Sequence, residues 1–415
     1  MKTLKKSLIF IISIFSFVAC SCSNVKNIAI HVEKDTIDLI PFPVKENDTY
    51  ILNNDFDLNG KTYLMPKGVT IILQNGVMKN GILIGQNTKI EGNLPFLDMV
   101  TIQGDWIVPI ISSKMFKNLS YDNALRDVMA LCNPAVSNKV VIENGVYYVS
   151  VEKNEGVGIR VSDNTNLTLN GTIIMRPNQY SNYDVFFING KNVTLGGKGV
   201  ICGDKEYHQG KSGEWGMGIE IGQAKNVTID GITVKDCWGD CIYIGDKSKN
   251  ITIRNCNLSK GRRQGVSITS ADHVWISNCV ISNVAGTDPQ FAIDVEPNKG
   301  QTVANISIKN VKSINCVGGF LVTGIAQNSK IRNISFSECE VKGATVKYPV
   351  VLMNAEAISF DNSSVDSNSE YSMLIQNIKS FKAQDNVFRA RGKKHLNRIN
   401  SKKLEINNNE FIIKK

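Results

Sequence analysis

Residues 219 to 253 read IEIGQAKNVTIDGITVKDCWGDCIYIGDKSKNITI, and this stretch contains the repeat that decides the fold. The tetrapeptides that begin at Asn226 and Asn250 share the form Asn-aliphatic-Thr-aliphatic and start 24 residues apart. Gly, Asn and Asp separate the short alternating runs, a pattern typical of strands joined by turns rather than of helices. The stretch therefore predicts a chain of short strands in regular order.

The same motif returns along the C-terminal two-thirds of the chain with nearly constant spacing. The equivalent positions are Asn166, Asn192, Asn226, Asn250, His273, Asn305, Asn333, Ala357, Ser380 and Lys403. The intervals between them are 26, 34, 24, 23, 32, 28, 24, 23 and 23 residues. Such a period is typical of a solenoid, in which coils stacked about 4.8 Å apart pair every strand edge and share one core. We expect an all-β fold with one coil per period.

The N-terminus has the composition of an export signal. Lys2, Lys5 and Lys6 precede an apolar stretch, residues 8 to 18, that is too short to span a membrane and ends at Ala19 and Cys20. Its end resembles a bacterial lipoprotein processing site, so we predict a signal peptide over residues 1 to 19 and lipidation of Cys20. Cys22 is an alternative first residue, and a plain cleaved signal is another. The expected location is the bacterial cell envelope, at the outer membrane or the periplasmic face, with the membrane contacted through the lipid.

Charge and cysteine content exclude several classes of protein. Removal of the signal lowers the formal net charge from +9 to +6, which gives little support for nucleic-acid binding. The chain has no P-loop, dinucleotide fingerprint or zinc-spaced Cys/His cluster, so we expect no organic cofactor and no metal. Cys256, Cys279 and Cys339 occupy one position of the repeat and their side chains point the same way, so free buried thiols are expected rather than disulfides.

The sequence divides into three segments: the signal peptide over residues 1 to 19, a β-rich segment over residues 20 to 115, and the β-solenoid over residues 116 to 415. Residues 20 to 115 contain strand-like pieces of irregular period, either an imperfect start of the stack or a small separate β module. Residues 122 to 131 form the one convincing short helix, with Asp122 as its N-cap, and are expected to plug the open end of the solenoid. Residues 140 to 149 follow as a hairpin, and the regular coils complete a segment from 116 to 415. The sequence makes no prediction of oligomeric state.

This order of helix, Gly-centred hairpin and coils with Asn ladders resembles the pectate-lyase-like superfamily of right-handed parallel β-helices. The resemblance covers roughly residues 120 to 415. It implies a single-stranded right-handed parallel β-helix with a short N-terminal capping helix. It does not imply one reaction, because the superfamily includes hydrolases, lyases, epimerases and tailspikes.

Two coils are longer than the others and flank an ordinary pair. The insertion at residues 203 to 216 precedes the strand Ile219 to Ile221, while residues 286 to 290 and 297 to 301 surround the strand Ile293 to Val295. With these aliphatic residues facing inward, alternation places Glu220, Tyr243, Ser267 and Asp294 outward in one row, and Glu296 one step further along. A polar groove is expected along this row.

The groove residues suit a sugar polymer. Aromatic side chains stack on pyranose rings, and arginines bind carboxylated sugars through paired hydrogen bonds. Cleavage of a glycosidic bond needs an acid and a base, for which the candidates are Asp240, Asp294 and Glu296; their expected separations favour an inverting mechanism. The predicted substrate contacts are Arg262, Arg263, Gln264, Trp238, Tyr243, Glu214, Trp215, His208 and Glu220.

Residues 239 to 244, GDCIYI, and 264 to 268, QGVSI, resemble polygalacturonase-type glycoside hydrolases. Asp240 matches the second of that family's paired aspartates. Three positions depart from the family pattern, namely Gly239, Met217 and Gln264. The resemblance implies a related groove with a different catalytic set.

Three functions remain open. The first is an exported glycoside hydrolase acting on an acidic polysaccharide. The second is a lyase or epimerase in which Arg262 or Arg263 neutralises a uronate carboxylate or acts as base, and acids such as Asp240 hold Ca²⁺. The third is a glycan-binding protein without catalysis, suggested by the three departures from the polygalacturonase pattern.

Overall fold

The computed structural model describes residues 37 to 39, 45 to 92, 94 to 151 and 156 to 414. Residues 38 to 415 form one compact unit. Cys20 and the predicted signal peptide lie outside the described residues. No helix among those residues is both long and apolar enough to cross a membrane.

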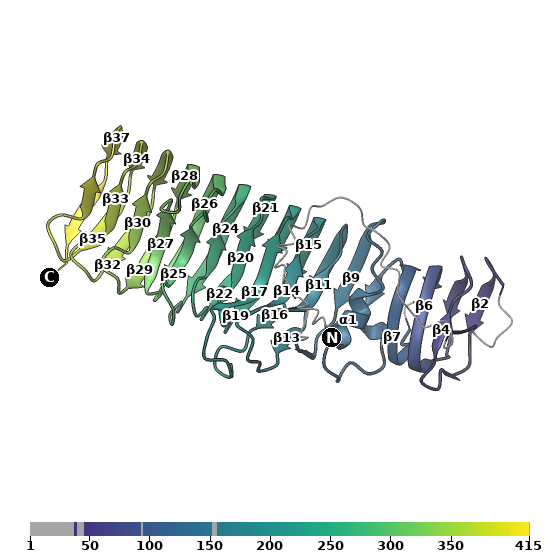
Figure 1. Cartoon of the computed structure of the whole chain (residues 1–415). Helices are drawn as coiled ribbons and strands as arrows, with labels where there is room; N and C mark the ends of the chain where they lie inside the picture. Colours follow the sequence, from purple (N-terminus) through teal and green to yellow (C-terminus); the bar gives the residue numbers. More distant parts are fainter. Residues whose placement is uncertain (1–36, 40–44, 93, 152–155, 415) are drawn as a thin grey trace, which may run out of the picture. The chain divides into compact units, whose positions relative to one another are not determined.

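The repeat forms a parallel β-solenoid, as predicted, in which strands of successive coils pair in register (Figure 1). One wall is a ten-stranded parallel sheet that carries the predicted groove. Its strands are β11 (Val157–Val161), β14 (Asn182–Ile188), β17 (Trp215–Gly222), β20 (Ile242–Gly245), β23 (Val266–Ile268), β25 (Phe291–Val295), β27 (Gly318–Thr323), β30 (Val350–Met353), β33 (Met373–Gln376) and β36 (Leu396–Ile399).

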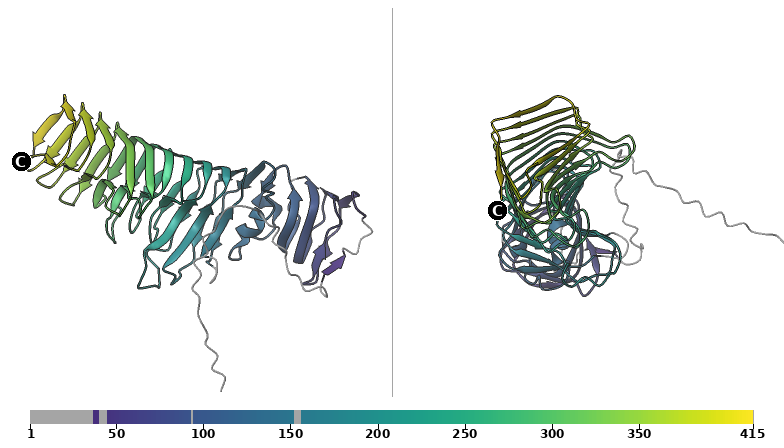
Figure 2. Two further views of the ribbon diagram at one scale, coloured as in Figure 1. Left: turned by 45° about the horizontal axis from the view of Figure 1, so that its top comes forward. Right: turned by 90° about the vertical axis from the view of Figure 1, so that its left-hand side faces the viewer.

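The remaining strands of the coils join into a 21-stranded sheet, also visible from two further directions in Figure 2. Its strands are β8 (Ile111–Ser112), β9 (Asn138–Ile142), β10 (Val146–Val149), β12 (Thr165–Leu169), β13 (Thr172–Met175), β15 (Lys191–Gly197), β16 (Val200–Cys202), β18 (Lys225–Asp230), β19 (Thr233–Lys235), β21 (Ser248–Arg254), β22 (Asn257–Ser259), β24 (Ala271–Ser282), β26 (Thr302–Ile314), β28 (Lys330–Ser337), β29 (Glu340–Ala344), β31 (Ala357–Asp361), β32 (Ser364–Ser367), β34 (Ser380–Gln384), β35 (Val387–Ala390), β37 (Leu404–Asn407) and β38 (Glu410–Ile413).

The irregular N-terminal part forms a separate seven-stranded sheet. Its strands are β1 (Ile37–Leu39), β2 (Thr49–Leu52), β3 (Phe56–Asp57), β4 (Thr62–Leu64), β5 (Thr70–Leu73), β6 (Met78–Glu91) and β7 (Leu97–Ile107). A parallel bridge between Leu97 and Phe116 connects this sheet to the segment around η1 (Ser113–Met115). The stack therefore has coil-like strands on both sides of the short helix.

The predicted helix exists but is shorter, since α1 spans Ala124–Met129. The prediction of Asp122 as N-cap was wrong. Asn123 directly precedes the helix, with φ 64°, and makes no side-chain capping bond. The carboxylate of Asp122 instead accepts hydrogen bonds from Ser150 Oγ and Arg176 Nε, both at 3.0 Å. The helix contacts β7 as well as β10 and β11, so it packs between coils.

The predicted hairpin at residues 140 to 149 is also wrong. Every recorded pairing of β9 and β10 is parallel, with strands of neighbouring coils. The turn at Glu143, Asn144 and Gly145 is a corner of one coil, and Tyr147 Oη donates to the Glu143 carbonyl at 3.1 Å across it.

The interior consists of stacked aliphatic and aromatic side chains. In the region of the groove, the eight residues predicted to face inward are all 0% exposed; they are Ile219, Ile221, Ile242, Ile244, Val266, Ile268, Ile293 and Val295. The cysteines of the described residues are free thiols, as predicted. Cys256 and Cys279 lie in one column, and each thiol donates to a backbone carbonyl.

Candidate functional site

The strand register confirms the predicted outward row. Glu220 pairs with Tyr243, Tyr243 with Ser267, and Ser267 with Asp294 on successive strands β17, β20, β23 and β25. Glu296 directly follows β25, and its amide nitrogen donates to the Ile268 carbonyl at 3.1 Å. Residues far apart in sequence therefore meet because each coil lies on the previous one.

Arg263 is the cation around which the carboxylates gather. Its Nη1 lies 3.5 Å from Asp240 Oδ2, and its Nε lies 3.8 Å from Glu214 Oε1. The same guanidinium partly opposes the rise that burial causes in the pKa values of Asp294 and Glu296. We call Arg263, Asp240, Asp294, Glu296 and Glu214 the Arg263 cluster.

Burial sets the protonation of this cluster. Asp240 is 0% exposed, and burial raises its pKa to about 6 although Arg263, Ser267 and the Gln264 backbone act in the opposite direction. The pKa of Asp294 is raised well above its usual value by burial and by the nearby charges of Glu296 and Asp240. Burial also raises the pKa of half-buried Glu296. The cluster therefore holds protons at a pH where exposed carboxylates have lost them.

Several buried polar atoms of the cluster have no hydrogen-bond partner among the described residues. They are Asp240 Oδ1 and Oδ2, Asp294 Oδ1, Ser267 Oγ and Arg263 Nε. Ser267 lies close enough to lower the pKa of Asp240, but its hydroxyl does not form a hydrogen bond of good geometry there. Unpartnered buried groups are costly, and a concentration of them is typical of a place where water or a ligand supplies the missing bonds.

Gln264 supports Asp294 instead of contacting a substrate. Its side chain is 0% exposed; Nε2 donates to Asp294 Oδ2 at 3.0 Å, and Oε1 accepts from the Phe291 amide at 2.7 Å. The amide thus fixes one oxygen of Asp294 and leaves the other unpartnered. The prediction of substrate contact was wrong because both ends of this side chain are already bonded inside the wall.

Arg262 and Trp238 likewise hold the insertion at residues 203 to 216 in place. Arg262 donates to the Gly213 carbonyl at 3.0 Å, and its guanidinium lies 3.8 Å from the centre of the Trp238 ring. His208 stacks on Trp238 at 3.9 Å. With both neighbours so close to its ring, Trp238 cannot stack on a sugar, contrary to the prediction.

His208 was also predicted to contact substrate, but its side chain is 0% exposed. Its Nδ1 lies 2.9 Å from Asp204 Oδ2, and Asp204 also bonds the hydroxyl of Tyr183. The imidazole therefore anchors the base of the insertion. The prediction failed because a long loop has no periodicity from which side-chain direction can be derived.

A hollow of about 430 Å³ lies beside the Arg263 cluster. Its lining residues are Asn182, Trp215, Met217, Glu220, Tyr243, Asp246, Arg263, Thr269 and Asn298. Four of these, Trp215, Glu220, Tyr243 and Arg263, were predicted as substrate contacts. Trp215 is 45% exposed, which leaves its ring available for stacking.

Asp184 is a site residue that the sequence analysis missed. It is 7% exposed, and its pKa is raised well above the usual value by burial and by hydrogen-bonded Glu220. The strand register is the signal that could have identified it. Asp184 pairs with Met217, and Met217 lies one coil before Asp240. The groove therefore contains a second pair of neighbouring carboxyl groups, whose pKa values are both raised by burial.

No group of three His, Cys, Asp or Glu side chains in the described part of the chain is arranged to hold a metal. In the Arg263 cluster the guanidinium already supplies the positive charge at the centre.

The comparisons with known proteins agree with this architecture. The family model described as "Right handed beta helix region" matches residues 217–315, the coils that carry the Arg263 cluster. The chain is a right-handed parallel β-helix. This confirms the fold predicted from the repeat.

One curated protein with a sequence similar to this chain is the SPbeta prophage-derived uncharacterized protein YorA of Bacillus subtilis (strain 168). The two are 32% identical over 165 residues, which is 34% of this chain and 28% of YorA. The chain thus spans less than a third of that relative's length.

Two solved structures share the β-helix fold at 12% identity. One is the tailspike protein gp49 from Acinetobacter baumannii bacteriophage Fri1, a capsular polysaccharide depolymerase, with a TM-score of 0.52 over 73% of this chain and 62% of the tailspike. The other is the exopolygalacturonase from Thermotoga maritima, with a TM-score of 0.50 over 72% of this chain and 91% of that enzyme. Both neighbours act on polysaccharides; at this identity the likeness shows the fold alone.

Proposed function

We propose that the chain is a glycoside hydrolase that cleaves an acidic polysaccharide bound along the groove of β17, β20, β23 and β25. The observation that carries the proposal is the Arg263 cluster, in which buried unpartnered polar atoms lie beside carboxyl groups of raised pKa. Hydrolysis of a glycosidic bond needs a carboxylic acid and a carboxylate in one place. The polysaccharide-active neighbours are consistent with this substrate class.

The exposure of the carboxyl groups suggests separate roles. Glu296 is half-buried and reachable from the groove, and its raised pKa suits a general acid that protonates the leaving oxygen. Asp240, paired with Arg263, is the base for a water held by the unpartnered oxygens of Asp240 and Asp294. Burial raises the pKa of Asp294 well above its usual value, which favours the protonated form, and Gln264 fixes its orientation.

The acidic substrate is proposed from Arg263 and Trp215. The Arg263 side chain is 17% exposed and lines the hollow, so its guanidinium can bind a sugar carboxylate there. Trp215 offers a ring face on the same side, in the hollow of about 430 Å³. A neutral glycan would leave the guanidinium without this partner.

The test is release of reducing ends from a panel of acidic and neutral polysaccharides. We expect turnover of an acidic chain, reduced at least about 100-fold in Asp240→Asn, Asp294→Asn and Glu296→Gln. Glu340→Gln is the matched control, because that carboxylate lies on β29 and pairs with Lys312 at 3.9 Å, outside the groove. Undiminished activity in Asp294→Asn and Asp240→Asn rejects the assignment.

A lyase or epimerase is the second candidate, and the central position of Arg263 favours it. In such an enzyme Arg263 would neutralise a uronate carboxylate while a neighbouring group removes the proton beside it. An unsaturated, ultraviolet-absorbing product and sensitivity to a chelator distinguish a Ca²⁺-dependent lyase from a hydrolase. Tight glycan retention without any product indicates a binding protein.

Export and lipid anchoring at Cys20 form part of the same proposal, because an extracellular polymer is met outside the cytoplasm. Metabolic labelling with a fatty acid tests it: the wild-type chain is expected to be labelled and Cys20→Ala unlabelled. Equal labelling of both would show that Cys20 is not the anchor.

A further inference from the structure

A row of lysines lies on the 21-stranded sheet, on the strands that follow the groove strands β14, β17 and β20 along the chain. Lys191 pairs in register with Lys225, and Lys225 with Lys249, on β15, β18 and β21. All three are exposed. Because successive coils lie about 4.8 Å apart, the row places one cation on each of three neighbouring coils. We call these three residues the lysine row.

Like charges directly opposite on neighbouring strands destabilise a sheet. Elsewhere on this sheet a lysine or arginine faces a carboxylate on the next coil: Arg254 bonds Asp230 at 2.9 Å, and Lys309 lies 3.1 Å from Glu338. The lysine row has no recorded ion pair within the described residues. Carboxylates do flank the row at its ends, since Asp163 Oδ1 accepts from the Lys191 backbone amide at 3.0 Å and Asp272 pairs in register with Lys249. Lys225 lies between two lysines, and this central charge is available to a partner.

The residues beside the lysine row also suit a sugar chain. Thr194, Thr228 and Thr252 form a second row on the same strands. Each is the second outward-facing residue after the lysine of its strand. This row continues in register to Trp275, which is 42% exposed. The surface thus combines cations, hydroxyl groups and one aromatic face.

The neutral side chains between these rows are already bonded to each other. Asn226 donates to Asn192, and Asn250 to Asn226, each at 3.0 Å. These amides make the strand edges rigid and leave the lysines and threonines as the groups available to a ligand.

The lysine row ends in a second hollow, of about 510 Å³, that Lys249 and Lys247 help to line. The nearby carboxylate of Asp272 accepts from Asn305 Nδ2 at 2.8 Å and lies 2.9 Å from His273 Nδ1. Its charge is therefore shared with those partners. The hollow lengthens the cationic surface beyond the third coil.

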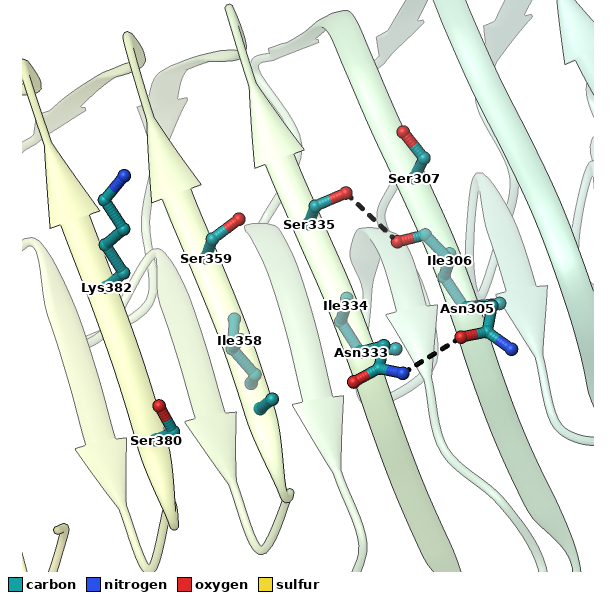
Figure 3. A pocket seen from close by; sticks show the side chains of 11 residues that line it. Asn305, Ile306, Ser307, Asn333, Ile334, Ser335, Ile358, Ser359, Ser380 and Lys382 are labelled. Atoms are coloured by element: carbon teal, nitrogen blue, oxygen red, sulfur yellow. Dashed lines mark hydrogen bonds between the residues drawn. The ribbon is translucent and has the colours of Figure 1, made fainter. Parts of the chain in front are cut away.

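The C-terminal coils differ: Figure 3 shows serines at the threonine positions of β26, β28 and β31, and Lys382 at that position of β34. Asn333 bonds Asn305 there at 3.0 Å. The lysine position is occupied by Asp272 on β24, by Ala304 on β26 and by Arg332 on β28, which lies 3.4 Å from Glu356. The three lysines in register thus lie on the coils that carry Asp184, Glu220 and Tyr243.

We propose that the lysine row, with Lys247 and Trp275, is a non-catalytic binding site for an acidic polysaccharide that lies along the stack. The nature of the ligand rests on the proposed function. A single file of cations fits one polymer strand with regularly spaced carboxylates, whereas duplex DNA presents two phosphate strands. Hydroxyl groups and a tryptophan are the further contacts that a pyranose chain uses. The site holds the polymer next to the groove and raises its local concentration there.

The experiment measures binding of polygalacturonate, alginate, neutral dextran and duplex DNA to the full chain by affinity electrophoresis. The test variant is Lys191→Gln/Lys225→Gln/Lys249→Gln. The control is Lys309→Gln/Lys312→Gln/Lys379→Gln, which removes the same charge from lysines that are ion-paired on the same sheet. All proteins carry Asp240→Asn to prevent turnover, and circular dichroism confirms their fold.

We expect the test variant to bind at least one acidic glycan at least about tenfold more weakly at low salt, and to lose most of its salt dependence. The control and dextran retention should not change. Equal binding by the test and control variants overturns the proposal, and so does a preference for duplex DNA over both acidic glycans. Lysine-dependent glycan binding, together with no product from the wild-type chain in the reducing-end assay, supports this site while rejecting the proposed hydrolase.

Discussion

Asp240 is a buried carboxyl group whose ionisation works against folding. Burial raises its pKa from 3.8 to about 6, so between these pH values the folded chain holds a proton that the unfolded chain has released. The stabilisation from this proton is complete below about pH 3.8 and is lost as the pH rises through about 6.

Asp240→Asn should therefore raise the free energy of unfolding at pH 7, by up to about 3 kcal/mol, while it lowers activity. At pH 4 the gain in stability should be much smaller. Denaturant unfolding at both pH values measures it. A loss of stability at pH 7 would show that the carboxylate is a structural ion-pair partner and not a strained functional group.

The two adjacent arginines should respond differently to substitution. Arg263 lowers the pKa of Asp240, so Arg263→Gln should move the acid limb of the pH-rate profile to higher pH and reduce kcat/KM. Arg262→Gln should instead lower the melting temperature, because Arg262 stacks on Trp238 and bonds Gly213. Identical pH profiles for Arg263→Gln and wild type would contradict the central role of that guanidinium.

Sequence reasoning reached the row of Glu220, Tyr243, Ser267 and Asp294 because strand alternation and the coil period together fix which side chains align. It could not separate Arg262 from Arg263. Both lie between strands β22 and β23, where no alternation applies, and their directions depend on contacts with a loop more than 40 residues away.

At the level of elements, one side-chain contact joins the insertion at residues 203 to 216 to the second enlarged coil. Lys205 Nζ donates to the Ala285 carbonyl at 2.8 Å and so connects the two enlarged coils. Lys205→Met should loosen the insertion and raise KM with little change in kcat. Hydrogen exchange should show faster amide exchange in residues 203 to 216 only; unchanged exchange there would refute this role.

The C-terminal coils are held by a column of phenylalanines. Phe360 lies between Phe336, with ring centres 5.6 Å apart, and Phe388, at 6.2 Å. Phe360→Ala should cost about 3 to 5 kcal/mol of stability because the coils cannot close the cavity. Activity at low temperature should remain, because the column lies outside the groove. A calorimetric melt and an assay on the same sample test both statements.

The elements that were predicted wrongly are those whose local sequence is compatible with two different structures. Glu143, Asn144 and Gly145 resemble a hairpin turn, since Asn-Gly between apolar runs is a common hairpin signal. The same residues can also turn a coil corner, and the parallel pairing with the next coil decides between them. Asp122 resembled an N-cap, but its distant partners Ser150 and Arg176 are not visible from the helix sequence.

For the whole molecule, the solenoid makes the consequences of deletion depend on position. Each coil contacts mainly its neighbours, so removal of residues 357 to 379, one 23-residue period, should leave a folded and active β-helix of lower stability. Removal of residues 250 to 272 takes away β23 with Ser267 and should abolish activity. Equal effects of the two deletions on kcat/KM would contradict a site localised in these coils.

The fold was predictable because the same pattern of strands and turns occurs in every coil. The site was predictable only in part, because its specific features arise where the period breaks: the burial of Asp240 and the bonds of Gln264 depend on how insertions cover one wall. The lysine row was present in the printed sequence as three Lys-Asn-aliphatic-Thr tetrapeptides, yet its meaning required the register, which places Lys225 between two other lysines.

The most direct measurement is a crystal structure of Asp240→Asn with an acidic oligosaccharide of the substrate found by the activity panel. The proposed function predicts the sugar in the groove, a glycosidic oxygen within hydrogen-bonding distance of Glu296, and an ordered water between residues 240 and 294. An oligosaccharide bound elsewhere, with no scissile bond near residues 240, 294 and 296, would contradict it.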